Sequence, residues 1–272
     1  MPLYMDRHYV VGATKAGVAQ AHDKDLAIQE KYPLKFLTYW FDEPRCTGFC
    51  LVESPDKETI QKAHNEAHGL VPNEIIEVDT RVVEAFLGRV KDPTPVDITG
   101  EVPIDSAFRD IMFTDLKDST LMTTMFGDTK ALHMLHIHNA LIRNALRENR
   151  GSEVKHTGDG IMASFVNVAH AVRCAVIIQK AFAEHNQRNV QESLHIRVGL
   201  SAGEPVEEDG DFFGSAVQLA ARICAYAEPD HILATQIVRD ECRSHRDVFV
   251  EVGQITPKGF DRPISAHEVK WQ

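Results

Sequence analysis

Residues 91–105, KDPTPVDITGEVPID, constrain the fold most strongly, because three prolines and a glycine interrupt a polar stretch there. Proline and glycine clusters of this kind are typical of loops and linkers. The stretch separates residues 1–90 from residues 106–272, and both pieces have ordinary domain sizes. We therefore expect two domains, 1–90 and 106–272, joined by a linker at 91–105.

The first domain shows strand and helix patterns in the order β-α-β-β-α-β. The predicted strands are LYMDRHYVV, LKFLTYWFD, GFCLVES and NEIIEVD, and the predicted helices are AGVAQAHDKDLAIQEKY and DKETIQKAHNEAHGL. Asp56 is a plausible N-cap of the second helix. This order predicts a ferredoxin-like split βαβ unit, an α/β sandwich.

The second domain alternates in the same way at a larger scale. FRDIMFTDL is a predicted strand, residues 120–150 form one long amphipathic segment, and the hairpin EVKHTGDGIMASF follows. Further strands and helices complete a sheet with flanking helices. The fold class is therefore α+β.

Charge and composition exclude several classes of protein. A formal net charge of −11 argues against nucleic-acid binding, which needs a basic face. No apolar run is long enough to span a membrane, and the N-terminus does not resemble a signal peptide. Five scattered cysteines favour reduced thiols over a zinc ribbon. We expect a cytoplasmic protein without a membrane partner.

Two aspartates carry the chemistry of the second domain. Asp115 ends a predicted strand before the hydroxyl-rich turn LKDST and a helix start, which together suit a phosphate site with Ser119 and Thr120. A carboxylate repels phosphate unless a divalent ion lies between them, and magnesium favours such a site. Asp159, between two glycines, could supply a second carboxylate. Each aspartate alone is equally compatible with a cap or a solvated turn.

A predicted helix adds a cation to this site. Arg222 follows Gln218 by four residues, so both side chains share one helix face. A guanidinium there would neutralise charge on metal-bound phosphates. The alternative is a surface salt bridge, the commoner role of a single helix arginine.

The segments FTDLKDST, KHTGDGIMASF, VGLSAGEP and GDFFGSAVQLAAR resemble class III nucleotidyl cyclases, in order, over residues 106–272. The resemblance implies a ferredoxin-like core, a head-to-tail homodimer and active sites at its interface. It assigns two divalent ions, Mg²⁺ or Mn²⁺, to Asp115, Asp159 and the Leu116 carbonyl. It assigns adenine recognition to Lys155 and Asp211, transition-state stabilisation to Arg222, ribose orientation to Gln218 and phosphate contact to Lys258.

Two positions depart from the family pattern. Gln218 replaces an asparagine, and Lys117–Asp118 replace a small, usually glycine-containing turn. Misplacing one such contact can reduce kcat by about 10²–10³-fold, so we expect a slow enzyme.

Histidines mark the first domain. His64 and His68 lie one helical turn apart and could chelate one metal, and His22 and His8 could converge on them. Solvated or core histidines are the simpler alternative. MDRHYV, LKFLTYWFDE, FCLVESPD and HNEAHGLVPNEI resemble small bacterial nickel-binding proteins over residues 1–80, which implies a histidine-rich nickel site. Imidazole also suits copper and zinc. Cys50 is expected to be a buried strand residue rather than a ligand.

These observations predict a homodimeric adenylate cyclase that converts ATP to 3′,5′-cyclic AMP and pyrophosphate, regulated by metal or ligand binding to its first domain. Guanylate specificity is disfavoured by Lys155 and Asp211. Two alternatives stay open: a catalytically weak homologue that acts as a nucleotide-binding signalling module, and a metal-binding protein whose cyclase half supplies only dimerisation.

Overall fold

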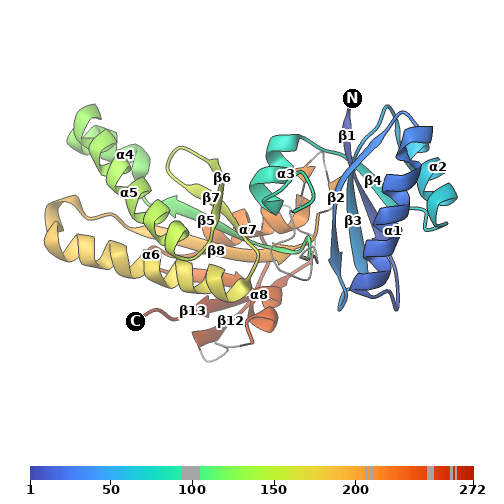
Figure 1. Ribbon diagram of the computed structural model, residues 1–272. Coiled ribbons are helices and arrows are strands. Elements are labelled where there is room, and N and C mark those ends of the chain that lie inside the picture. Colours follow the sequence, from blue (N-terminus) through green and yellow to red (C-terminus); the bar gives the residue numbers. More distant parts are fainter. Residues whose placement is uncertain are drawn as a thin grey trace. The chain divides into compact units, whose positions relative to one another are not determined.

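The computed structural model describes residues 1–93, 105–205, 207–208, 211–212, 214–243, 248–257, 260 and 262–272, and it gives only the backbone at 207–208 and 211–212. The chain divides into two compact units (Figure 1). The N-terminal unit comprises Met1–Phe108 and Pro205–Phe212, and the C-terminal unit comprises Arg109–Glu204 and Phe213–Gln272. Most of the predicted linker, 94–104, lies outside the described residues.

The N-terminal unit has the predicted ferredoxin-like topology. Its sheet has the order β2-β3-β1-β4, and every neighbouring pair is antiparallel. The elements are β1 (Leu3–Tyr9), α1 (Lys15–Ile28), η1 (Gln29–Lys31), β2 (Lys35–Asp42), β3 (Thr47–Glu53), α2 (Lys57–Ala67), β4 (Glu74–Glu77), α3 (Thr80–Leu87), β9 (Glu207–Glu208) and β10 (Asp211–Phe212).

The two long helices of this unit, α1 and α2, are capped and lie on the same side of the sheet (Figure 1). The Thr14 side chain accepts from Gly17 N, and the Asp56 side chain accepts from Thr59 N, so orphan donors of each first turn are satisfied. Apolar side chains between sheet and helices form the core, which includes Tyr4, Phe36 and Ile60. The expected N-cap at Asp56 is thus confirmed.

The C-terminal unit is built on a seven-stranded sheet with the order β12-β13-β11-β8-β5-β7-β6. Its part β8-β5-β7-β6 is antiparallel and repeats the strand order of the N-terminal sheet. The elements are β5 (Arg109–Leu116), α4 (Ser119–Phe126), α5 (Asp128–Glu148), β6 (Ser152–His156), β7 (Ile161–Phe165), α6 (Val168–Arg188), η2 (Val190–Glu192), β8 (Ile196–Gly203), α7 (Gly214–Tyr226), β11 (Ile232–Thr235), α8 (Gln236–Glu241), β12 (Phe249–Ile255) and β13 (Ile264–Val269).

The long amphipathic segment expected over residues 120–150 is two helices rather than one. Gly127 separates α4 from α5 with φ of 78°, a backbone conformation that ends a helix and that glycine adopts without strain. On another element, Gly199 lets α7 lie close to β8, because a Cβ there would come within 2.4 Å of Cys224 N. Within the part of the chain that the structure describes, no helix is long and apolar enough to cross a membrane.

Candidate functional sites

The turn that carries Asp159 is fastened to the end of strand β5. Leu116 N donates to Asp159 O at 3.0 Å, and Ile161 N donates to Thr114 Oγ1 at 2.9 Å. The Ser119 hydroxyl, in the first turn of α4, donates to the Asp159 carboxylate. The predicted site residues Asp159, Leu116 and Ser119 are therefore held together at one edge of the C-terminal sheet.

The two glycines that flank Asp159 are each required by a different feature of the turn. Gly158 has φ of 92°, in the region that favours glycine. Gly160 is pressed against β5, because a Cβ there would lie only 2.0 Å from the Thr114 carbonyl oxygen. The turn can approach β5 this closely only without a side chain at position 160.

Asp115 lies directly before Leu116 on β5 and is half-buried. Its cross-strand neighbour on β8 is Arg197, whose Nε donates to Asp115 Oδ2 at 2.9 Å. A second Arg197 nitrogen contacts the same oxygen, and Nη1 also donates to Ala225 O. Asp115 and Asp159 thus present two half-buried carboxylates on neighbouring segments, and such hard oxygen ligands fit Mg²⁺ or Mn²⁺.

The turn after Asp115 has a backbone conformation that glycine adopts more readily than other residues. Asp118 has φ of 55°, in the left-handed region, and its side chain does not cap α4. The Lys117 ammonium lies 4.0 Å from the Asp118 carboxylate, so the added negative charge has a nearby cation. Thr120 is exposed beside Ser119 in the first turn of α4.

The remaining predicted cyclase residues lie elsewhere. Gln218 and Arg222 are one turn apart on α7, half-buried and exposed respectively, and among the described residues neither is hydrogen-bonded to Asp115 or Asp159. Lys155 is exposed on β6, opposite Met162 of β7. The side chain of Asp211 and the whole of Lys258 lie outside the described residues, so their predicted roles stay predictions.

A buried cluster of titratable side chains fills the space between the N-terminal sheet and its helices. At its centre, His64 of α2 is fully buried between two carboxylates. Its Nε2 lies 2.9 Å from Asp6 Oδ2 of β1, and its Nδ1 lies 3.0 Å from Asp25 Oδ1 of α1. His68 Nε2 lies 3.2 Å from His64 Nδ1 and 3.1 Å from Asp25 Oδ1.

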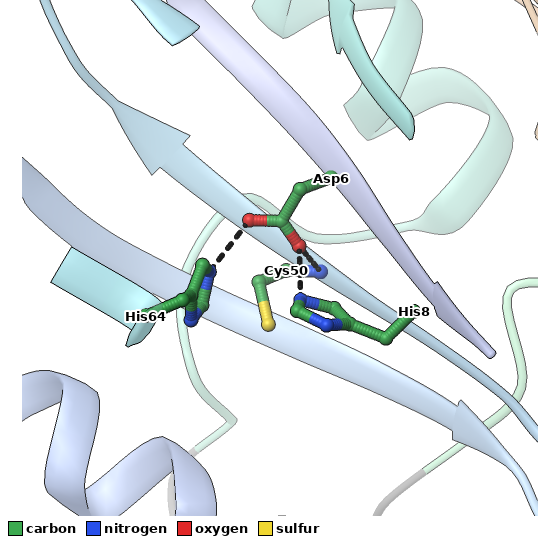
Figure 2. Close-up of side chains that lie close together, drawn as sticks. All are labelled: Asp6, His8, Cys50 and His64. Carbon is green, nitrogen blue, oxygen red and sulfur yellow. Dashed lines mark hydrogen bonds and ion pairs between the residues drawn. The ribbon is translucent and has the colours of Figure 1, made fainter. Parts of the chain in front are cut away.

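Figure 2 shows the Asp6 side of this cluster, where four side chains point toward one another. His8 Nε2 lies 3.0 Å from Asp6 Oδ1, and the same oxygen accepts from Cys50 N at 3.1 Å. The ligand atoms of Asp6, His8, Cys50 and His64 all lie within 4.8 Å of one another, and so do those of Asp25, His64 and His68.

The charges in this cluster are strongly coupled. Burial alone would lower the pKa of His64, but the charge of Asp6 and hydrogen bonds to Asp25 and Asp6 outweigh it and raise that pKa to about 10. Burial opposes ionisation of Asp6 as well, yet His64 and His8 hold its pKa well below the usual range. Burial and the nearby Asp6 raise the pKa of the Cys50 thiol well above its ordinary value. Without a metal, the cluster is thus held by an imidazolium between carboxylates.

His22 is the predicted ligand that the structure leaves outside both donor groups. Its ring is buried against Tyr39, with centroids 4.5 Å apart, and its Nε2 lies 3.0 Å from Asp92 Oδ2. It does line the same cavity of about 80 Å³ as His8, His64 and His68. Asp92 belongs to the predicted linker and lies one residue before the end of the described segment 1–93.

Sequence reasoning missed three residues of these sites. Asp6 and Asp25 could have been found from their spacing, because Asp6 precedes His8 by two strand residues and so shares its face. Asp25 follows His22 by nearly one helical turn. Arg197 gave no such local signal, since its pairing with Asp115 depends on strand register across 82 positions.

The C-terminal unit combines an extended ferredoxin-like sheet with two carboxylates at the end of its central strand, which is the architecture of a nucleotidyl cyclase catalytic domain. Residues 109–269 match the family model described as adenylate and guanylate cyclase catalytic domain, and the chain belongs to this family. Residues 4–78 match a second model, described as nickel responsive protein SCO4226-like.

Known proteins and structures agree with this assignment. An uncharacterized protein of Mycobacterium tuberculosis (strain ATCC 25618 / H37Rv) is 32% identical over 159 residues, covering 58% of this chain and 40% of that protein. An adenylate cyclase of Mycosarcoma maydis is 33% identical over 166 residues, covering 52% of this chain and 6% of that protein. The chain thus spans less than half the length of these curated relatives.

Among solved structures, an adenylate/guanylate cyclase/hydrolase from Silicibacter pomeroyi is 33% identical, with a TM-score of 0.50 and coverage of 60% of this chain and 95% of that chain. An adenylyl cyclase from P. aeruginosa has a TM-score of 0.52 at 21% identity, covering 60% of this chain and 93% of that chain, and supports the fold alone. These matches confirm the α+β cyclase fold expected from the sequence.

Proposed function

We propose that the protein is an adenylate cyclase that converts ATP to 3′,5′-cyclic AMP and pyrophosphate in a homodimer. The observation that carries the proposal is the docking of the Asp159 turn on β5, which brings its carboxylate to the strand end that bears Asp115. Relatives named adenylate cyclase support the choice of reaction. The chain spans only 6% to 9% of those fungal proteins, so the activity of the whole chain is a proposal.

The residues have distinct roles in this reaction. Two divalent ions, Mg²⁺ or Mn²⁺, would activate the ribose 3′-hydroxyl and stabilise charge on the triphosphate. Asp115, Asp159 and the Leu116 carbonyl would hold these ions. Ser119 orients the Asp159 carboxylate through its hydroxyl. In the absence of ions, Arg197 fixes the Asp115 carboxylate by a hydrogen bond. Once ions are bound, the Arg197 guanidinium would remain as a positive charge beside the incoming phosphates.

The other half of the site comes from the second subunit of the dimer. Arg222 neutralises the charge that grows on the phosphates during bond breaking. Gln218 orients the ribose, and Lys258 contacts the phosphates. The resemblance to dimeric cyclases supports placing Gln218 and Arg222 of one chain opposite Asp115 and Asp159 of its partner.

Base selection rests on hydrogen-bond complementarity. Lys155 donates to adenine N1, and Asp211 accepts from the exocyclic amine. Guanine presents the opposite donor and acceptor at this edge, so its binding would leave both groups unpaired. An unpaired polar group in a binding site costs about 1–3 kcal/mol, which supports ATP over GTP.

Product formation from ATP and GTP, in Mn²⁺ and in Mg²⁺, tests the proposal. We expect cyclic AMP from ATP alone, a loss of at least about 10²-fold in Asp115→Asn, and normal folding of that variant by circular dichroism. Asp110→Asn is unsuitable as a control because Asp110 is buried, so Asp128→Asn, on the exposed start of α5, serves instead. Cyclic GTP as the main product would refute the base assignment. ATP binding without product would favour the alternative of a nucleotide-binding signalling module.

We further propose that the N-terminal unit regulates the cyclase through the linker. Both described ends of the linker are fastened to β2: Asp92 N donates to Leu37 O at 3.0 Å, and Phe41 N donates to Asp105 O at 3.0 Å. Arg89 joins them, because it donates to the Tyr39 carbonyl, contacts the Asp105 carboxylate and lies over the Trp40 ring at 4.8 Å. Tyr39 and Trp40 also line the cavity beside the histidine cluster.

This arrangement predicts a metal response that depends on Arg89. Metal that enters the cavity repacks Tyr39 and Trp40 and shifts the linker ends. We expect Ni²⁺ to change the cyclase rate of the wild type, and Arg89→Ala to keep the basal rate but lose the response. Arg81→Ala, an exposed arginine of α3, is the matched control. Equal responses in wild type and Arg89→Ala would contradict this route.

A further inference from the structure

We propose that helix α5 positions Lys155 for base recognition by holding strand β6 on both sides of a bulge. Arg143 of α5 holds Glu153, which precedes the bulge. Asn139 of α5 holds His156, which follows it. Both α5 side chains are positioning residues that act on the base only through the backbone that carries Lys155. Because the contact of Lys155 with adenine belongs to the proposed function, this inference rests on that function.

The strand register shifts at Val154, which is the extra residue of the bulge. Glu153 pairs with Ala163 of β7. Lys155 pairs with Met162, which is the neighbouring residue of β7. Successive residues of a strand point to opposite faces of the sheet. Glu153 and Lys155 therefore point to opposite faces, although residues two positions apart share one face in a regular strand.

The same shift brings Glu153 and His156 to one face of β6. His156 pairs with Ile161, which lies two residues from Ala163 on β7 and so shares its face. In a regular strand, two side chains three positions apart would point to opposite faces, and α5 could contact only one of them. The bulge thus gives α5 two points of contact and turns Lys155 away from the helix.

The spacing of the two contacts on α5 matches the bulged strand. Asn139 and Arg143 lie one helical turn apart, so their side chains share one face of the helix. Arg143 donates two hydrogen bonds to the Glu153 carboxylate, from Nε at 2.7 Å and from Nη2 at 2.8 Å. A bidentate pair of this kind fixes orientation as well as distance. His156 Nε2 lies 3.1 Å from Asn139 Oδ1, and because an amide oxygen can only accept, the ring donates.

Asn139 is itself tied to the core of the C-terminal unit. Its Oδ1 also lies 3.0 Å from Nδ1 of His138, a fully buried ring that packs against Phe182 with centroids 5.6 Å apart. Burial lowers the pKa of His138, which favours a neutral ring that donates from Nδ1. One oxygen accepts both bonds with its two lone pairs. The helix side of the contact is therefore rigid.

Strand β6 needs this support because it lies at the edge of the seven-stranded sheet and pairs with β7 alone. The bulge interrupts the only ladder that holds it. A slip of one residue exchanges the two faces of a strand, so it would return Lys155 to the side of α5. The two contacts from α5 oppose that slip.

The turn that carries Asp159 does not depend on these contacts. Its hydrogen bonds run to β5, from Leu116 N to Asp159 O and from Ile161 N to Thr114 Oγ1. Loss of the contacts from α5 should therefore move Lys155 and leave the two predicted metal-binding carboxylates in place.

The test compares Arg143→Glu with the double variant Arg143→Glu/Glu153→Arg in steady-state assays of the full chain. The single change sets two carboxylates against each other, and the double variant restores an ion pair of reversed polarity. The side chains of Arg143 and Glu153 are 48% and 29% exposed, so neither change leaves a buried charge. In Arg143→Glu we expect the KM for ATP to rise by about tenfold with kcat within about threefold, because one hydrogen bond from a charged donor is lost. The double variant should return the KM to within about threefold of the wild type.

Arg147→Glu is the matched control, because it makes the same charge change one turn further along α5, where Arg147 donates to Asn144 of its own helix. It should leave the KM for ATP unchanged. The inhibition constant of GTP as a competitor should be the same in all variants, because guanine does not accept the hydrogen bond from Lys155. The Mn²⁺ concentration for half-maximal rate should also stay the same.

Hydrogen–deuterium exchange over residues 152–157 follows the strand without catalysis. Exchange there should be faster in Arg143→Glu and return to the wild-type rate in the double variant. A wild type that forms no cyclic nucleotide would refute the proposed function and this role of Lys155 together. An active wild type with the same KM as Arg143→Glu, or an equal weakening of ATP and GTP in that variant, would overturn this inference alone. A loss that the double variant does not restore would do the same.

Discussion

Replacing Gly160 with alanine tests whether contact of the Asp159 turn with β5 builds the cyclase site. The new Cβ would lie 2.0 Å from the Thr114 carbonyl oxygen and 3.0 Å from Thr157 Oγ1, whereas ordinary contact begins at 3.4 Å. Both obstacles are close, and the nearer one belongs to the backbone of a central strand. The turn must therefore recede from β5 by more than about 1 Å, and overpacking of this kind costs about 1–3 kcal/mol.

This displacement also breaks specific hydrogen bonds. Leu116 N loses Asp159 O, and Ile161 N loses Thr114 Oγ1, at a cost of about 1 kcal/mol each. We expect the free energy of unfolding to fall by about 3 kcal/mol in urea denaturation. A misplacement of about 1 Å can cost about 10²-fold in rate, so cyclic AMP formation should fall by about that factor.

Gly158→Ala separates backbone strain from the contact with β5. Gly158 has φ of 92°, but a Cβ there would meet nothing within 4 Å. We expect a stability loss of about 1 kcal/mol and a much smaller loss of rate. If Gly160→Ala were as stable and as active as the wild type, the contact with β5 would not position Asp159, and our account of the site would fail.

Two further predictions concern the C-terminal unit. Burial lowers the pKa of His138, so the unfolded chain binds more protons below its ordinary pKa of 6.5, and stability should fall as the pH drops from 7 to 5. His138→Gln should remove up to about 1.4 kcal/mol per pH unit from that slope in urea unfolding, and an unchanged slope would contradict the assignment. Gln218→Asn should raise the rate of cyclic AMP formation by about tenfold or more in steady-state assays. Asparagine is one methylene shorter, so it returns the side-chain amide to the position expected for the family. If the Gln218→Asn variant is active but no faster than the wild type, our explanation of the glutamine at this position is refuted.

The strand and helix order was predictable from the sequence because both units follow strong local patterns. The strand predicted at LYMDRHYVV and the N-cap predicted at Asp56 each rested on a short local segment, and the structure confirms both. The division of residues 120–150 into α4 and α5 was not predicted, although Gly127 stands at the break. A single glycine inside a helical pattern is often tolerated, so its φ of 78° could not be read from the sequence.

The candidate sites were predictable only where one short segment carries several donors. His64 and His68 share a helix face, so their proximity followed from spacing alone. The convergence of Asp6 and Asp25 on His64 depends on packing of α1 and α2 over the sheet. His22 shows the converse, since its helix was placed correctly but its side chain faces Asp92 at the start of the linker.

The two units share one strand order, but the carboxylates on their equivalent strands differ in exposure to solvent. In the N-terminal unit, Asp6 lies in the middle of β1 under two helices and is fully buried, whereas Asp115 lies near the end of the equivalent strand β5 with 31% of its side chain exposed. An ion at Asp115 can exchange with each nucleotide, because solvent and substrate reach the strand end. Any ion that bound between Asp6 and His64 would have to pass the apolar cavity and displace a buried network of protons. The same strand order therefore places one group of carboxylates within reach of solvent and the other out of its reach.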